Sequence, residues 1–487
     1  MLRPATKVYR FGFVLLFMAV FFTLPAQAAT GLNAMRALAA EGYDVAGLVV
    51  NLSSGERVAE YNADQLLSPA SVTKLYTAAK ALEVWGADYR FETDVLVQGQ
   101  RRGPTIDGNL VLRGGGDPSF TNSGLWRLAL DVAQSGIQEV SGDLIVDESR
   151  FGRVTCVTHD RCKAEKKSWH SYDSLLSSTA VNHGNIAVVV SPGESIGAPA
   201  HISIDPYPLP TMDVRGSINT VKGYGAQFSV SRFTENGSDW LKVSGTIGVK
   251  AGTHRVYRSV GQPARYTGNL FREFLQAAGV KVGGKVEVSL LPETGDRLSS
   301  YQGEPLNQIL GDMLYYSNNL IADVLTLNIR AERNPLAPVN LTIAGGELQS
   351  YARERTRASA FANSSDAILH DGSGLNPDNR LAPVDLVALL DGVYQRTRDF
   401  PYLLGALRVP AQSPSRGLSG SNEIWDRLSV KTGGLSEPVS VHTLAGYLRF
   451  KNGDWGAFAM MVNGTRANRW IPRVKAFEAM RKDLEKL

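Results

Sequence analysis

Cysteine is scarce in this chain of 487 residues, which holds only Cys156 and Cys162, with five residues between them in a polar loop. No C-x-x-C or H-x-x-x-H pair accompanies them in the sequence, so the spacing does not favour a metal site. We therefore expect no metal and no other cofactor. If the chain is exported to an oxidising compartment, the two cysteines predict a local disulfide, with a pair of free thiols as the alternative.

Long apolar runs are absent after residue 28, so nothing in the remaining chain predicts a transmembrane helix, and we expect at most peripheral membrane association. The first 28 residues combine a basic start, an apolar stretch and a small-x-small end, namely Arg3, Lys7 and Arg10, residues 11–24, and Ala26-Gln27-Ala28. This pattern predicts a secretory signal peptide over residues 1–28 and a periplasmic or cell-envelope location. An uncleaved anchor is the weaker alternative, because the apolar stretch is short for a membrane span.

A strong excess of charge of one sign is also missing. The formal charge of +4 falls to about +1 without the basic residues of the first 28 positions, which gives no electrostatic reason to expect nucleic-acid binding. Low-complexity tracts are absent too, and 43% hydrophobic with 20% charged residues is a globular composition. Because 487 residues exceed a single hydrophobic core, we expect two or three domains.

Mixed helical and strand patterns at both ends of the chain surround a middle that is rich in strands. The end segments are strands over 46–51 and 57–61, helices over 72–85 and 383–394, a helical pattern over 306–314 that continues over 317–329, strands over 428–431, 443–450 and 457–462, and a terminal helix. We expect an α/β (α+β) domain over residues 29–90 and 297–487. A large β-rich insertion over residues 91–296 would split it, and we expect this insertion to form two subdomains, with a nested β-rich part near 185–250.

Ser71-Val72-Thr73-Lys74, the only S-x-x-K in the chain, begins the expected helix over 72–85. Residues three apart are neighbours on one helix face, so Ser71 Oγ and Lys74 Nζ can meet. An amine desolvated there can lose its proton and activate the hydroxyl. By itself, this spacing more often marks a helix cap and a solvated lysine.

Two later motifs favour the catalytic interpretation of Ser71 and Lys74 over the helix cap. Ser317-Asn318-Asn319 stands at the start of an apolar helical stretch, and Lys431-Thr432-Gly433 ends an expected strand. Their order after Ser71 matches the penicillin-recognising set S-x-x-K, S-D-N and K-T-G. Ser217-Ile218-Asn219 also fits S-x-N, and we interpret it as an ordinary loop.

With the turn at 114–118 and the segment Asp371-Gly372-Ser373-Gly374-Leu375, these motifs resemble the class C low-molecular-weight penicillin-binding proteins. These are the D-alanyl-D-alanine carboxypeptidases/endopeptidases of the penicillin-binding protein 4 type. The resemblance runs from about residue 30 to the last residue, and the long insertion is a trait of that family. It implies a transpeptidase or β-lactamase-like domain, an acyl-enzyme on Ser71, peptidoglycan stem peptides ending in D-Ala-D-Ala as substrates, and covalent binding of β-lactam antibiotics.

The resemblance also implies a role for each motif residue. Ser71 would be the nucleophile and Lys74 its general base, while Ser317 would relay a proton to the leaving amine and Asn319 would bind the substrate amide. Lys431 would favour a neutral Lys74 by repulsion and attract the substrate carboxylate. Thr432 would bind the substrate through its hydroxyl, and Gly433 would contribute as part of the strand. The backbone N–H groups of Gly434 and Ser71 would together form the oxyanion hole.

Two positions depart from the family pattern. Asn318 replaces the middle Asp of S-D-N, which is not the residue assigned chemistry. Gly434 stands where relatives usually carry Ser or Thr, so the backbone donor remains, but a hydroxyl that helps to hold the terminal carboxylate is missing. Leu435 has no hydroxyl to replace it.

The sequence leaves three other interpretations. His370-Asp371-Gly372-Ser373 lacks the G-x-S-x-G elbow of a catalytic triad, and we interpret it as a structural turn near the active site. A β-lactamase-like hydrolase would share the motifs but deacylate fast. A non-catalytic peptidoglycan-binding scaffold with a relic site gains slight support from Gly434, although the intact motif residues argue against it.

Overall fold

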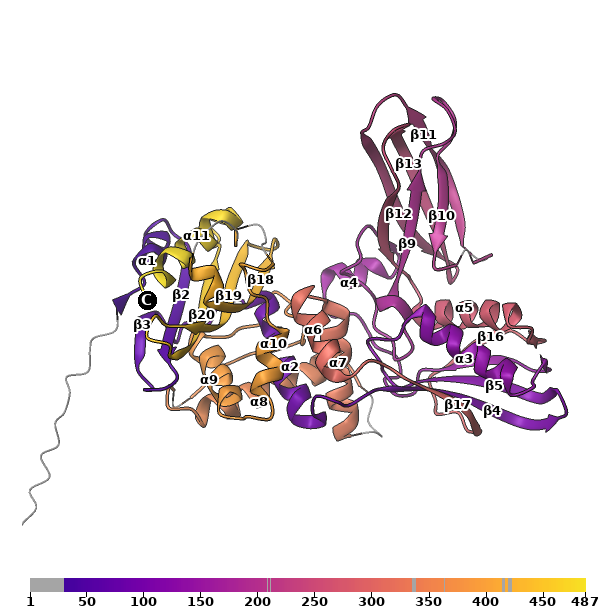
Figure 1. Cartoon of the computed structure of the whole chain (residues 1–487), viewed down its shortest axis with the longest axis horizontal. Coiled ribbons are helices and arrows are strands. Elements are labelled where there is room, and N and C mark those ends of the chain that lie inside the picture. Colours follow the sequence, from indigo (N-terminus) through magenta and orange to yellow (C-terminus); the bar gives the residue numbers. More distant parts are fainter. Residues whose placement is uncertain are drawn as a thin grey trace, which may run out of the picture.

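The computed structural model describes residues 30–207, 209–210, 212–334, 339–362, 364–413, 417–418 and 423–487. Figure 1 shows both ends of this chain, in indigo and yellow, folded together in one lobe, while the middle of the chain forms two further lobes. The predicted signal peptide over residues 1–28 lies outside the described residues. Among the described helices, none combines the length and the apolar character that crossing a bilayer requires.

A six-stranded sheet joins the two ends of the chain in the order β1-β3-β2-β20-β19-β18. Its strands are β1 (Thr30–Gly31), β2 (Asp44–Asn51), β3 (Arg57–Tyr61), β18 (Leu428–Leu435), β19 (Val441–Arg449) and β20 (Trp455–Asn463). Neighbouring strands are antiparallel except for the parallel pair β1–β3. Successive β2 side chains enter different cores, Leu48 on one face of the sheet and Val49 on the other, so both faces are covered.

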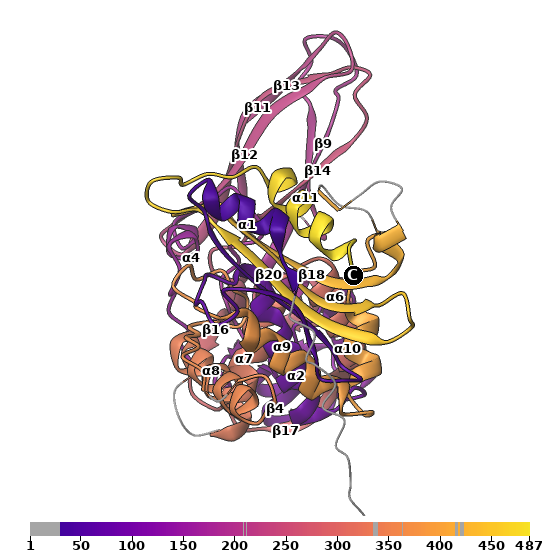
Figure 2. The same ribbon diagram turned by 90° about the vertical axis from the view of Figure 1, so that its left-hand side faces the viewer.

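Helices from both ends of the chain pack on one face of this sheet. These are α1 (Asn33–Ala40) and α11 (Arg473–Leu484), which lie in front of the sheet in Figure 2. The Asp483 carboxylate of α11 accepts the backbone N–H groups of Ala34 and Met35 at 3.0 and 2.9 Å, which satisfies two donors in the first turn of α1. The short 3-10 helix η3 (Glu423–Asp426) contributes to the same core.

The opposite face of the sheet carries the helices that bear two of the sequence motifs. They are the 3-10 helix η1 (Ala70–Thr73), α2 (Lys74–Trp85), α6 (Leu306–Tyr315), α7 (Asn319–Arg333), α8 (Leu341–Arg357), α9 (Pro383–Tyr394) and α10 (Phe400–Ala406). Their apolar side chains share one buried core with the residues of β2, β19 and β20 that point to this side. This packing brings segments more than 200 positions apart against α2.

The lower right lobe of Figure 1 holds a seven-stranded sheet with the hairpin β4–β5 inside it. Its strands are β4 (Glu92–Arg102), β5 (Thr105–Gly114), β6 (Glu139–Val140), β7 (Leu144–Asp147), β15 (Lys281–Val282), β16 (Val286–Ser289) and β17 (Asp296–Gln302). The helices α3 (Asn122–Gln134) and α5 (Pro263–Ala277) pack against it and bury residues such as Leu128 and Phe271.

Two smaller sheets form the lobe that projects upward in Figure 1, in the orders β10-β9-β14 and β11-β13-β12-β8. Their strands are β8 (Lys167–Ser168), β9 (Asn185–Ser191), β10 (His201–Asp205), β11 (Asp213–Val221), β12 (Ala226–Glu235), β13 (Ser238–Gly248) and β14 (His254–Ser259). The helix α4 (His159–Ala164) lies near the base of this lobe, and the 3-10 helix η2 (Val181–Gly184) directly precedes β9.

The expected α/β class is confirmed, whereas the domain limits at residues 91 and 296 stay a prediction; β4 and β17, which lie at these limits, pair with each other. Two local predictions are wrong. The helical pattern does not run through residue 317, because α6 ends at Tyr315 and Ser317 has a φ of 57° before α7 begins. The segment Ser217-Ile218-Asn219 is not a loop, since it lies within β11 with Ile218 buried.

Candidate active site

Ser71 lies on the short helix η1, which leads directly into α2. The preceding residue, Ala70, has a φ of 47°. That region costs a non-glycine residue roughly 1–3 kcal/mol. Thr73 Oγ1 donates to the Ala70 carbonyl and Thr443 Oγ1 to the Pro69 carbonyl, both at 2.8 Å. The surrounding chain thus holds a tight turn immediately before Ser71 and fixes the position of its side chain.

Lys74 is the first residue of α2, and its side chain is fully buried. Its Nζ lies 3.0 Å from Ser71 Oγ, 2.8 Å from Asn319 Oδ1 and 2.6 Å from the carbonyl oxygen of Ser373. These three acceptors match the three donors of an ammonium group. After losing one proton, the amine can keep two of these bonds and accept the hydroxyl proton of Ser71.

The charges around Lys74 make a neutral amine accessible near neutral pH. Burial lowers the pKa of Lys74 to about 8, against the opposing negative charges of Asp323 and Asp371 and with the help of the positive charge of Arg161. At pH 7 a group with that pKa is neutral in about one molecule in ten. Lys74 is therefore poised to act as a base without a large free-energy cost for its deprotonation.

Lys431 lies on β18 with 2% of its surface exposed. Its Nζ donates to Ser317 Oγ and to the carbonyl of Thr432, both at 2.8 Å. Burial lowers the pKa of Lys431 well below its usual range, and the positive charge of Lys74 acts in the same direction. Because the two ammonium groups repel each other, the pair favours the loss of a proton from one of the two lysines.

The break between α6 and α7 positions Ser317 for its contact with Lys431. The left-handed backbone of Ser317 ends the run of α6. The next residue, Asn318, is the N-cap of α7, and its Oδ1 accepts the N–H of Ile321 at 3.2 Å. Asn and Asp are about equally good N-caps. The asparagine in the middle of this S-x-N motif therefore preserves the capping that aspartate would provide.

Gly433 lets β18 approach the Ser71 turn closely. A Cβ atom at this position would lie 2.1 Å from Thr443 Oγ1, 2.7 Å from the Pro69 carbonyl and 3.0 Å from Ser71 N. No side chain fits there without a shift of the backbone. The absence of a side chain at Gly433 is thus what places the strand beside the nucleophile.

The outer edge of β18 offers backbone donors next to this turn. The N–H of Val430 donates to the Arg408 carbonyl, and the Val430 carbonyl accepts the N–H of Arg408. Both bonds lie on the side of β18 that faces away from β19. Because N–H directions alternate along a strand, the N–H groups of Thr432 and Gly434 point to that same outer edge. Gly434 itself is exposed, and a Cβ atom there would meet only the Val441 carbonyl, at 3.6 Å.

The predicted motif residues thus lie around one site, with Lys74 joined to Ser71 and Asn319, and Lys431 joined to Ser317. A cavity of about 590 Å³ adjoins it, bounded by Ser317 to Leu320 and by residues of the inserted region, among them Tyr172, Asn182 and Tyr257. The site therefore opens between the helical face of the six-stranded sheet and the insertion.

Sequence reasoning missed a layer of residues behind this site. Asp323 follows the S-x-N motif on α7, and its partner Arg161 lies 162 positions earlier in the chain, so no local pattern joins them. The turn at 370–373 was expected near the site, but its contact with Lys74 through the Ser373 carbonyl was not. Cys156 and Cys162 form a disulfide one residue from Arg161.

Comparison with known proteins gives consistent matches over nearly the whole chain. A family model described as the D-Ala-D-Ala carboxypeptidase 3 (S13) family matches residues 33–480. The D-alanyl-D-alanine carboxypeptidase DacB of Haemophilus influenzae is 25% identical over 460 residues, covering 92% of this chain and 91% of that protein. The D-alanyl-D-alanine carboxypeptidase of an Actinomadura species is 29% identical over 446 residues, covering 88% of this chain and 79% of that protein.

The fold is similar to that of a solved structure. The crystal structure of penicillin binding protein 4 (dacB) from Haemophilus influenzae matches with a TM-score of 0.75 at 22% identity, covering 92% of this chain and 97% of that one. The same protein complexed with a novel β-lactam matches with a TM-score of 0.72 at 22% identity, covering 93% and 98%.

Proposed function

The chain belongs to the D-Ala-D-Ala carboxypeptidase 3 (S13) family, and we propose that it carries out this activity through an acyl-enzyme on Ser71. It is a serine-type D-alanyl-D-alanine carboxypeptidase and a homologue of the penicillin-binding protein 4 type. The observation that carries the assignment of Ser71 is the contact of its Oγ with the buried Lys74 Nζ at 3.0 Å. A solvated lysine and a simple helix cap would not produce that arrangement.

In the proposed acylation step, Ser71 Oγ attacks the carbonyl carbon of the penultimate D-alanine while Lys74 accepts the hydroxyl proton. The bond to the terminal D-alanine nitrogen then breaks, and that amine must receive a proton to leave. Ser317 is proposed to donate it and to recover a proton from Lys431, whose Nζ lies 2.8 Å from Ser317 Oγ. Water then attacks the ester, and its proton passes through Ser317 back to Lys431. Lys74 returns the proton that it accepted to Ser71 Oγ as the shortened peptide leaves, which restores the starting state of all four groups.

The charge that develops on the carbonyl oxygen needs donors that are already in place. The N–H groups of Ser71 and Gly434 are proposed to fill this role, supported by the close approach of β18 to the Ser71 turn at Gly433. The terminal carboxylate would lie against Lys431 and Thr432. Asn319 Oδ1 accepts from Lys74, and its Nδ2, which lies 3.5 Å from the Tyr172 carbonyl, is proposed to donate to the substrate amide instead.

The proposed substrates are peptidoglycan stem peptides that end in D-Ala-D-Ala, reached after export to the periplasm or cell envelope. Covalent binding of β-lactams follows from the same chemistry, since their strained amide offers the carbonyl that Ser71 attacks. The solved complex of the Haemophilus influenzae protein with a β-lactam supports this by similarity of fold. Endopeptidase cleavage of cross-linked peptides is proposed as a second reaction of the same site.

Incubation with a labelled penicillin, followed by digestion and mass spectrometry, tests the nucleophile. The adduct is expected on the peptide that contains Ser71 and is expected to disappear in Ser71→Ala. Labelling that survives this substitution unchanged would refute the assignment. Ser317→Ala should slow acylation strongly, whereas Ser217→Ala, in the second S-x-N sequence on β11, should not, because Ser217 is an exposed residue of the inserted region.

Release of D-alanine separates the proposed function from the two alternatives. A pentapeptide should lose D-alanine in many catalytic cycles, whereas a chromogenic cephalosporin should acylate once and then turn over slowly. Rapid cephalosporin turnover would favour a β-lactamase, and a folded protein that releases no D-alanine would favour a scaffold. Digestion of a cross-linked dimer, with products identified by mass, tests the endopeptidase reaction.

A further inference from the structure

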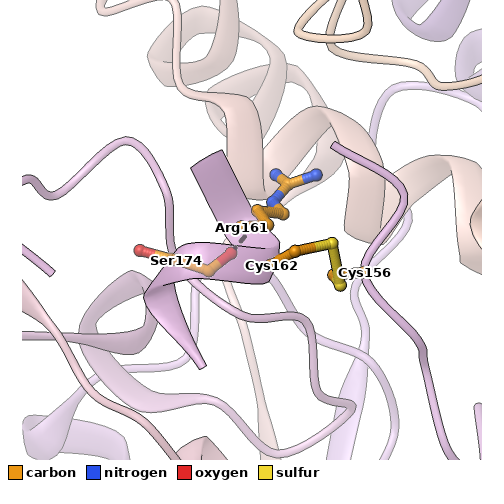
Figure 3. The surroundings of a disulfide bond; sticks show 4 residues. All are labelled: Cys156, Arg161, Cys162 and Ser174. Atoms are coloured by element: carbon orange, nitrogen blue, oxygen red, sulfur yellow. Dashed lines mark hydrogen bonds between the residues drawn. A yellow bond between two sulfur atoms is a disulfide. The ribbon is translucent and has the colours of Figure 1, made fainter. Parts of the chain in front are cut away.

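Arg161 is one of the largest fully buried side chains in the described chain, although it comes from a six-residue helix of the inserted region. Its Nη1 lies 2.6 Å from Asp323 Oδ2, and the two side chains are 2% and 0% exposed. Its Nε donates to the Ser174 carbonyl at 3.0 Å. Figure 3 shows Arg161 beside Cys162 on α4, with the guanidinium and the disulfide extending in different directions. A buried ion pair thus joins the insertion to α7.

The other oxygen of Asp323 binds the turn that contacts Lys74. Asp323 Oδ1 accepts the backbone N–H groups of Gly372 and Ser373 at 3.0 and 2.9 Å. The Ser373 carbonyl in turn accepts Lys74 Nζ at 2.6 Å. From the other side, Thr77 Oγ1 donates to the Gly372 carbonyl at 2.9 Å. One carboxylate therefore connects Arg161 to the backbone group that positions the catalytic lysine.

We propose that Arg161 is a positioning residue for the reaction at Ser71, because it neutralises and orients Asp323, which holds the turn that places Lys74. The inference rests on the proposed function for its readout, which is acylation of Ser71. It adds that the inserted region takes part in building the active site, through a residue that touches neither substrate nor nucleophile. A buried carboxylate that loses the guanidinium paired with it is strongly unfavourable.

The charges that face Lys74 come from several packed elements: Asp323 on α7, Asp371 in the adjacent turn, Arg161 on α4 and Lys431 on β18. The two carboxylates raise the pKa of Lys74, and Arg161 lowers it. Removing the guanidinium leaves the carboxylates uncompensated, so the lysine should hold its proton to higher pH. Since acylation needs the neutral amine, its rise with pH should move to higher pH as well.

The test is the rate constant for acylation by a fluorescent penicillin, measured from pH 6 to pH 10. In Arg161→Met the rise with pH should move upward by about one pH unit, which makes acylation roughly tenfold slower at pH 7. Arg161→Lys keeps the charge and should keep the wild-type midpoint, even if its maximal rate falls. An Arg161→Met protein that melts cooperatively and has an unshifted midpoint would overturn the proposal.

Arg113→Met is the matched control, because Arg113 also pairs with a fully buried aspartate, Asp147, at 3.1 Å. That aspartate likewise accepts two backbone N–H groups, from Ser149 and Glu293, but it has no described contact with Lys74. Arg113→Met should leave the midpoint of the acylation profile within about 0.2 pH units of the wild type. An equal shift in both variants would mean that loss of any arginine paired with a buried aspartate has this effect, and would overturn the proposal.

A second pair of variants keeps the test valid if Arg161→Met does not fold. Asp323→Asn retains Arg161, and the double variant Arg161→Met/Asp323→Asn removes both charges without leaving either one unpaired. The midpoint of Asp323→Asn should lie below that of the double variant, because the two differ only in the positive charge. Equal midpoints would overturn the role of Arg161. A wild-type protein that forms no penicillin adduct on Ser71 would instead refute the proposed function.

Discussion

Gly434→Ser is expected to improve carboxypeptidase activity, because it restores a hydroxyl beside the proposed site of the substrate carboxylate. Residues two apart on a strand point to the same side, so a side chain at 434 would lie beside that of Thr432. The position is exposed, and the nearest atom to a new Cβ is the Val441 carbonyl at 3.6 Å, an ordinary contact distance. The serine therefore fits without a shift of the backbone.

The size of the effect follows from the new hydrogen bond and its surroundings. A hydrogen bond to a charged group contributes about 1.5–3 kcal/mol, and exposure to water at this position favours a value at or below the lower end. A gain of about 1 kcal/mol corresponds to a roughly fivefold rise in kcat/KM for D-alanine release from a pentapeptide. The assay is steady-state release of D-alanine by wild type and variant at one pH.

Two neighbouring variants separate the hydroxyl from the added bulk. Gly434→Ala supplies the Cβ without the hydroxyl and should leave kcat/KM close to the wild-type value. Gly433→Ala should lose most activity, because its Cβ would lie 2.1 Å from Thr443 Oγ1. The reasoning is refuted if serine and alanine at 434 act alike. It is also refuted if the gain persists on a substrate whose terminal carboxylate is replaced by an amide.

Three further outcomes are expected. Acylation of the wild type should fall about tenfold per pH unit below pH 8, because the pKa of Lys74 is about 8; a rate that is flat from pH 6 to pH 8 would exclude this lysine as the base. Asp117→Asn should stabilise the protein at pH 7 but not at pH 3.5. Burial raises the pKa of Asp117 to about 6, so the wild type loses about 3 kcal/mol of stability as the pH rises from about 4 through 6. Urea unfolding of both proteins at the two pH values checks this prediction. Replacing both Cys156 and Cys162 with serine should lower the stability by about 2 kcal/mol and slow acylation, because the disulfide is expected to hold α4 in place. A double variant with unchanged melting and acylation would contradict this expectation.

Much of the fold near the catalytic motifs could be predicted from the sequence, because those segments carry strong local patterns. The helix over 383–394 and the strand over 57–61 have the predicted limits, and the strands expected over 443–450 and 457–462 occur as β19 and β20. The helix over 341–357 was not predicted, since its mean hydropathy is low and Gly345 and Gly346 interrupt its pattern. Glycine pairs usually argue against a helix, and packing overrides that preference here.

The break at Ser317 shows where local reasoning fails. Leu314 and Ile321 are seven positions apart and face the same core, so the apolar period suggests one continuous helix. A serine with positive φ has no sequence pattern that distinguishes it. The contact that its side chain makes comes from a distant part of the chain, since Lys431, 114 positions later, donates to Ser317 Oγ. Only the tertiary structure contains that information.

Two residues with left-handed backbone, Ala70 and Ser317, occur where a chain segment must turn sharply so that a serine hydroxyl meets a lysine. Each conformation costs free energy locally, so the rest of the fold must compensate for it. At Ala70 the compensation includes the bond from Thr73, and at Ser317 it includes the bond from Lys431. The S-x-x-K and K-T-G motifs therefore do more than supply reactive groups. Their non-reactive and charged members also hold the strained turns that present those groups, which explains why each motif alone is weak evidence and all three together specify one site.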